Sequence, residues 1–75
     1  MELDTMTDVD WNVIVAFAEN DMNSQRTADS LYMHRNNVRY HLMKVYRLTG
    51  LDPKKFCDLV KLLYIFNQKE GVKNG

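Results

Sequence analysis

Residues 24–42 decide the fold of this 75-residue chain, and they read SQRTADSLYMHRNNVRYHL. A short helix ending near Leu31, a three-residue turn and a longer helix beginning at Arg35 are the parts of a helix-turn-helix. Ala28 is expected where the two helices cross, because a close crossing requires a small side chain. The residues expected to close a local core beneath the crossing are Leu31, Met33, Val38 and Leu42.

A first helix is predicted before this motif. Apolar residues at i, i+3, i+4 and i+7 mark one face of a helix, and here they are Trp11, Ile14, Val15 and Ala18. Thr7 followed by Asp10 resembles a capping box and predicts the start of this helix. Turn-forming residues from Asn20 onward predict its end, and Ser24 is the expected N-cap of the next helix.

Two further helices are predicted after the turn. The third runs from Arg35 to Leu48 or Thr49, with an apolar stripe at Val38, Leu42, Val45 and Leu48, and Gly50 ends it in a left-handed conformation. The fourth opens with Asp52 as N-cap and Pro53 in the first helical position, and it reaches about Gln68. Its expected buried face comprises Phe56, Leu59, Val60, Leu63 and Phe66, and Leu62, Tyr64 and Ile65 extend the apolar surface further around.

The predicted fold class is therefore all-α, a compact four-helix domain that contains a helix-turn-helix. It corresponds to a winged-helix-like or homeodomain-like DNA-binding core without a wing. Residues 8–69 are expected to form this domain. Residues 1–7 are expected to be disordered or poorly ordered, and residues 70–75 to be a frayed tail.

Composition excludes several classes of protein. With 45% apolar and 27% charged residues, the chain is typical of a soluble domain, and its longest apolar run, residues 13–18, is too short to cross a bilayer. A cytoplasmic location is expected. Cys57 is the only cysteine and is predicted to lie in the core. With only two histidines beside it, no metal site is expected, and the absence of a glycine-rich phosphate loop or a nucleophile with a base argues against an enzyme or a cofactor.

The charges are strongly segregated, although the net charge is zero. Residues 1–22 contain six acidic and no basic side chains, so residues 23–75 carry a balance of plus six. Within residues 34–55, six basic side chains face only Asp52. A basic stripe of this kind is the footprint of phosphate contact, although a solvated basic face is an equally good interpretation of charge alone.

The second helix of the motif presents groove-reading residue types on its outward face. An arginine can bond two acceptors of guanine, and an asparagine can pair with the edge of adenine. Met43 also lies on this face, and Asn37 is expected to be partly tucked in. The candidate base contacts are Arg35, Asn36, Asn37, Arg39 and Tyr40.

The preceding helix is expected to anchor the domain, because free N–H groups at a helix start favour a phosphate. Further basic residues add affinity with little sequence preference. The candidate contacts with the DNA backbone are Ser24, Gln25, Arg26, His34, Lys44, Arg47, Lys54 and Lys55.

Some of these residues have structural alternatives. His34 is either the N-cap of the third helix or a phosphate contact. Asn36 and Asn37 either contact bases or favour the helix start through bonds to the backbone. His41 lies beside the apolar stripe and is interpreted as a packed, hydrogen-bonded histidine.

Three runs of residues resemble the C-terminal helix-turn-helix domain of PucR-type bacterial transcriptional regulators, which include purine-catabolism and sugar-diacid regulators. They are residues 26–31, 33–40 and 48–52, and the most specific parts are His-Arg-Asn at 34–36 and Leu-Thr-Gly at 48–50. The resemblance covers about residues 10–66. It implies a four-helical DNA-binding module that normally ends a longer regulator, after a sensory region.

The chain also departs from that family. The family usually has threonine at the place of Asn37 and arginine at that of His41, so the resemblance carries no DNA contact onto either residue. Tyr32 stands in the turn where many helix-turn-helix proteins have glycine.

The sequence thus predicts sequence-specific binding of double-stranded DNA in transcriptional control, with a homodimer on paired half-sites and with no membrane or small-molecule ligand. The alternative is a protein-interaction or dimerisation module that uses the last helix. The candidate dimerisation residues are Leu62, Tyr64 and Ile65. Alternatively, in so small a domain, these residues belong to the core.

Overall fold

The structure, a computed structural model, describes residues 6–69. It contains four helices and, within those residues, no strand, so the predicted all-α fold is confirmed. The helices are α1 (Asp8–Glu19), α2 (Ser24–Leu31), α3 (Arg35–Thr49) and α4 (Phe56–Lys69). No helix in this part of the chain has the length and apolar character needed to span a membrane.

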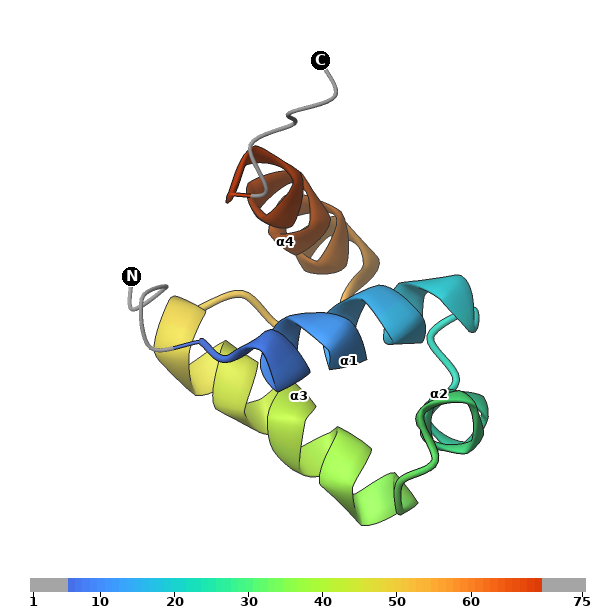
Figure 1. Ribbon diagram of the computed structural model, residues 1–75. Coiled ribbons are helices and arrows are strands. Elements are labelled where there is room, and N and C mark those ends of the chain that lie inside the picture. Colours follow the sequence, from blue (N-terminus) through green and yellow to red (C-terminus); the bar gives the residue numbers. More distant parts are fainter. Residues whose placement is uncertain (1–5, 70–75) are drawn as a thin grey trace.

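The first helix is the centre of the fold. α1 contacts each of the other three helices, whereas among residues 6–69 α4 packs against α1 alone. Figure 1 shows α4 on one side of α1, and α2 and α3 on the other. Being covered on two sides, α1 is buried over more of its circumference than the predicted stripe, and its core residues include Val13 and Phe17 as well as Trp11 and Ile14.

The core is completed by apolar residues from the other three helices. Ala28 is fully buried in α2, as its place at the helix crossing requires. The stripe of α3 is buried at Val38, Leu42 and Val45. From α4, Leu59 and Leu62 enter the core, and the ring of Phe66 packs against Trp11 with the ring centroids 5.5 Å apart.

Backbone capping defines both ends of α1. The predicted capping box is present: the Asp10 amide donates to the Thr7 hydroxyl, and the Thr7 amide donates to the Asp10 carboxylate. At the other end, Met22 N–H bonds Phe17 C=O and Asp21 N–H bonds Ala18 C=O, which is a Schellman motif. Asp21 and Met22 both have positive φ, and the chain thereby turns into α2.

Two residues of the segment before α1 pack against the helices. Met6 is buried and Thr7 caps α1, whereas residue 8 was the expected start of the domain. The remainder of the segment expected to be poorly ordered, residues 1–5, and the expected tail, residues 70–75, lie outside the described residues.

The predicted cap of α2 is wrong by one residue. Asn23, not Ser24, is the N-cap, and its side-chain oxygen accepts the Arg26 amide at 2.9 Å. Asparagine and serine cap helices equally well, so residue type alone does not choose between neighbours. The chain direction set by Asp21 and Met22 makes the choice.

The predicted start of α4 is also wrong, because the helix begins at Phe56. Asp52–Lys55 instead form a turn, in which Lys55 N–H bonds Asp52 C=O and Lys54 N–H bonds the Asp52 side chain. Proline suits the second position of such a turn as well as the first turn of a helix. Pro53 is fully buried beneath the turn.

Four residues of α4 lie elsewhere than expected. Cys57 is exposed rather than buried, and Phe56 and Val60 are 69% and 46% exposed. Leu62, which was expected on the outer surface, is fully buried instead. The reason is that only one side of α4 faces α1, and Leu59 and Leu62 occupy that side.

Candidate nucleic-acid interface

The surface of α3 opposite the core carries the candidate base contacts. Arg35, Asn36, Asn37, Arg39 and Tyr40 are all exposed, so Asn37 is not tucked in as expected. Val38 and Leu42, which belong to the apolar stripe on the opposite side of the helix, are buried. Rigid packing of one side of α3 therefore presents these polar side chains together at its N-terminal half.

The start of α3 settles one of the alternatives for His34. The residue is the N-cap, and its Nδ1 accepts the Asn36 amide at 3.0 Å. Among residues 6–69, the Asn36 and Asn37 side chains make no hydrogen bond to the backbone, so helix initiation does not occupy them. Their amide groups are available to an external partner.

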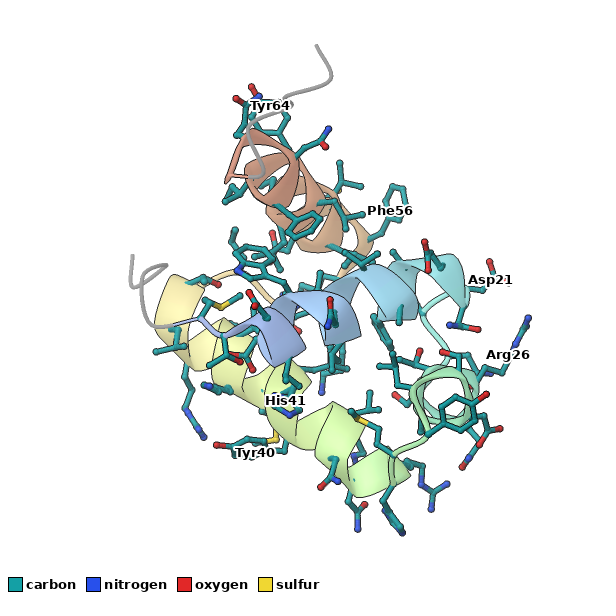
Figure 2. The ribbon with its side chains drawn as sticks, viewed as in Figure 1. Asp21, Arg26, Tyr40, His41, Phe56 and Tyr64 are labelled. Carbon is teal, nitrogen blue, oxygen red and sulfur yellow. The ribbon has the colours of Figure 1, made fainter. Side chains whose placement is uncertain are left out.

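The basic residues differ in whether a carboxylate neutralises them. In the described part of the chain, Arg35, Arg39 and Arg47 form no ion pair. Arg26 lies 3.7 Å from Asp21, but both side chains are largely exposed, and such a surface pair is weak enough for a phosphate to replace it. Figure 2 shows this pair at the edge of the molecule beside α2.

Lys44 is placed differently from these arginines. Its Nζ lies 2.9 Å from Asp10 Oδ2, and its side chain is mostly buried. Its charge is thus already paired, and the structure does not place it as a free cation for DNA phosphate.

A fully buried carboxylate, that of Asp10, links α1 to α3. It receives the Thr7 amide and the Lys44 ammonium on one oxygen, and His41 Nδ1 lies 2.6 Å from the other. Burial by itself raises the pKa of Asp10, but the hydrogen bonds from Thr7, Lys44 and His41 and the charge of Lys44 outweigh it, so the pKa lies below its ordinary value. His41 is a packed, hydrogen-bonded histidine, as predicted.

The start of α2 contains the other candidate phosphate contacts. Asn23 satisfies the amides of Arg26 and Thr27, and no hydrogen bond within residues 6–69 uses the amides of Ser24 and Gln25. The Ser24 side chain is half-buried, and the Gln25 amide group donates to Asp29 at 3.0 Å. The backbone of this first turn is therefore the more accessible part.

The last two basic candidates lie outside the helix-turn-helix. Lys54 and Lys55 are exposed on the turn before α4. Of the candidate dimerisation residues, Tyr64 is 65% exposed, Ile65 is half-buried, and Leu62 belongs to the core of a single chain. Figure 2 shows Tyr64 at the far end of α4, away from Tyr40 on α3.

Sequence reasoning missed two features, one on the exposed side of α3 and one in the buried contact between α1 and α3. Tyr46 is 52% exposed on α3, and its position seven residues after Arg39 is the signal that places it on the same side of the helix. Asp10 was interpreted only as a capping residue. The signal was an acidic residue four before Ile14 and seven before Phe17, on the buried side of α1.

No group of three His, Cys, Asp or Glu side chains among residues 6–69 is arranged to hold a metal ion. Within the same residues, the structure thus offers exposed polar and basic groups on a helix-turn-helix and no metal centre.

Comparison with known proteins identifies relatives of this architecture. A model of the family described as the PucR C-terminal helix-turn-helix domain matches residues 11–65. The uncharacterized protein YsfB of Bacillus subtilis (strain 168) is 35% identical over 60 residues, which cover 76% of this chain and 16% of that protein. The uncharacterized protein YxkF of the same organism is 33% identical over 58 residues, covering 77% of this chain and 20% of its own length.

The chain therefore spans only about a fifth or less of the length of these two relatives. No solved structure matches the chain.

Proposed function

The chain belongs to the family of PucR C-terminal helix-turn-helix domains, a family of DNA-binding transcription regulators, and on that premise we propose that α3 reads a specific duplex sequence in the major groove. The observation that carries the proposal is the exposed N-terminal half of α3. Five side chains suited to base edges or phosphates share that surface: Arg35, Asn36, Asn37, Arg39 and Tyr40.

The proposed reading chemistry follows from the side chains. The arginines donate two hydrogen bonds to guanine, and the asparagines pair with adenine. Tyr40 contacts a thymine methyl group or a phosphate. These contacts distinguish bases only because the packed side of α3 holds the helix at a constant depth in the groove.

We propose contacts with the DNA backbone from residues that precede the reading half of α3 and from residues that follow it. The first turn of α2, at Ser24, Gln25 and Arg26, directs amides and one cation toward a phosphate. His34 caps α3 with Nδ1, which leaves its other ring nitrogen for a phosphate. Arg47, Lys54 and Lys55 add non-specific attraction.

A salt titration tests the function. Labelled duplexes selected from a random pool are titrated with the domain at several salt concentrations, with a scrambled duplex as control. We expect tight binding of the selected duplex, weaker binding of the control, and an affinity that falls steeply with salt for both. Absence of binding at low salt, or an affinity independent of salt, contradicts the proposal.

A second candidate function is self-association through the outer side of α4. Phe56, Val60 and Tyr64 recur at intervals of four residues and are 69%, 46% and 65% exposed, with Ile65 half-buried beside them. We propose that this surface, or the remainder of a longer regulator, brings two copies onto paired half-sites. In a bacterium such a regulator acts in the cytoplasm, where the DNA lies, and the proposal involves neither catalysis nor a small-molecule ligand.

A further inference from the structure

The buried carboxylate of Asp10 makes more connections to α3 than a capping residue requires. A capping box needs only the two bonds between Thr7 and Asp10. Asp10 also holds Lys44 Nζ at 2.9 Å and His41 Nδ1 at 2.6 Å, and its side chain is fully buried. The start of α1 is thereby joined to the middle of α3 by two charge-assisted contacts.

Both partners lie on the side of α3 that adjoins the reading surface, by which we mean the exposed side chains of Arg35, Asn36, Asn37, Arg39 and Tyr40. His41 and Lys44 are three residues apart, so they occupy one side of the helix. His41 directly follows Tyr40, and their rings are in edge-to-face contact with the centroids 5.2 Å apart. Figure 2 shows His41 toward α1 and Tyr40 pointing away from the helices.

Because Asp10 is buried, its contacts with His41 and Lys44 restrict movement of α3 relative to α1. A buried carboxylate is stable only while hydrogen-bonded and paired, and losing one partner leaves an uncompensated charge. Apolar contacts between α1 and α3 are non-directional, whereas the bonds of 2.6 and 2.9 Å also require particular groups of the two helices to face each other. The cluster therefore favours one position of α3 relative to α1.

We propose that Asp10 is a positioning residue for DNA reading: through His41 and Lys44 it sets the depth and rotation of α3, and through His41 it sets the orientation of Tyr40. This inference rests on the proposed function and assigns Lys44 a role inside the domain instead of on a phosphate.

The two roles of Lys44 predict opposite results for the Lys44→Met variant. As a phosphate contact, Lys44 contributes equally to all duplexes, and its removal reduces the salt slope by about one. As a partner of Asp10, its removal shifts α3 and weakens binding of the selected duplex more than that of the scrambled one, because contacts with base edges require closer placement than contacts with phosphates. The salt slope then stays unchanged.

The experiment compares four variants of the chain on the selected and the scrambled duplex across salt concentrations. Circular dichroism and Trp11 fluorescence identify a temperature at which every variant is folded. We expect Asp10→Asn and Lys44→Met to lose about tenfold in discrimination between the two duplexes, the scale of one lost base reading. Lys44→Arg, which retains the charge, restores discrimination. Thr7→Ala, which weakens the same helix start but leaves the links to α3, retains it.

Two results of the binding experiment overturn the proposal. One is an equal loss on both duplexes with a smaller salt slope for Lys44→Met, and the other is full discrimination in a folded Asp10→Asn variant. NMR provides a readout without DNA: Asp10→Asn must move the amide resonances along α3, whereas Thr7→Ala must not. Resonance changes confined to α1 contradict the proposal even if the chain binds no DNA, and salt-dependent binding by the wild type with unchanged α3 resonances leaves the proposed function intact.

Discussion

Arg39 is exposed on the reading surface, and its charge forms no ion pair within residues 6–69. We expect Arg39→Ala to cost about 1–3 kcal/mol in binding and to relax the preference at one base pair, because the guanidinium recognises guanine through two bonds. The measurement is the affinity for duplexes that differ at single positions.

Arg47→Ala is the matched control for this prediction, since it removes an exposed arginine of the same helix, nearer its C-terminal end, that likewise has no ion-pair partner in the described part of the chain. It should weaken all duplexes alike and reduce the salt slope by about one. If Arg39→Ala behaves in the same way, Arg39 is a phosphate contact and does not read a base.

The lowered pKa of Asp10 leads to a prediction of how the free energy of unfolding depends on pH. Its pKa is lowered in the folded chain, so its contribution to the free energy of unfolding is present above the pKa of the unfolded state, near 3.8. That contribution is lost as the pH falls through the lowered folded value. We expect urea midpoints of the wild type to fall more steeply below about pH 4 than those of Asp10→Asn.

The control for this pH dependence is Asp8→Asn, which removes an exposed carboxylate from the same first turn of α1. Both substitutions weaken the interaction with the helix dipole, but only Asp10 contacts basic residues of α3. Identical acid profiles for the wild type and Asp10→Asn would contradict the assigned role of the cluster.

At the scale of elements, the turn between α2 and α3 contains a strained residue. Tyr32 has φ 56° and ψ 44°, which is the left-handed conformation, and its side chain is 96% exposed. The Tyr32 and Met33 amides bond Asp29 and Ala28 C=O, so the geometry belongs to the helix end and not to the side chain. A tyrosine thus adopts the conformation that glycine usually provides.

We therefore expect Tyr32→Gly to raise the free energy of unfolding by about 1 kcal/mol, because it removes the left-handed penalty and loses almost no packing. Urea unfolding followed by Trp11 fluorescence measures the change. Tyr32→Ala, which keeps a Cβ, should be nearly neutral. Destabilisation by the glycine variant would show that the exposed ring contributes to the fold.

At the scale of the whole molecule, α3 and α4 lie on different sides of α1 (Figure 1), and α4 is the helix that carries the exposed apolar side chains Phe56, Val60 and Tyr64. DNA binding by α3 and self-association through α4 can therefore be changed independently by substitution. We expect concentration-dependent association of the wild type in sedimentation, and its loss in Tyr64→Glu, because a charge is costly in an apolar contact. Affinity for a single half-site should not change beyond the effect of the added charge.

Asn12→Glu controls for that charge, since Asn12 is exposed on α1. It should leave association intact and should alter DNA affinity as much as Tyr64→Glu does. A wild type that remains monomeric at high concentration excludes self-association through α4 in this domain.

Local sequence determined the features that depend on neighbouring residues. The start of α1 was predictable because the Thr7–Asp10 pair acts within one helical turn. The end of α3 was predictable because Gly50, with φ 79°, also acts within one turn. The exposed surface of α3 was predictable for the same reason: the period of 3.6 separates Arg39 from Val38 regardless of what covers the helix.

Only the tertiary structure decided features for which the local signals are ambiguous or distant. Asn23 and Ser24 are equal caps, and Pro53 suits either a turn or a helix start, so the path of the chain chose between them. α4 is apolar around most of its surface, so the position of α1 decided that Leu62 is buried and Phe56 exposed.

The role of Asp10 was the least accessible to sequence reasoning. Its partners, His41 and Lys44, lie 31 and 34 residues away along the chain, and no local periodicity links them. The physical reason is that local bonds determine where a helix begins and ends, whereas burial depends on the elements packed around it. Here the packing of α3 on α1 turned an N-terminal capping residue into the partner of two basic side chains.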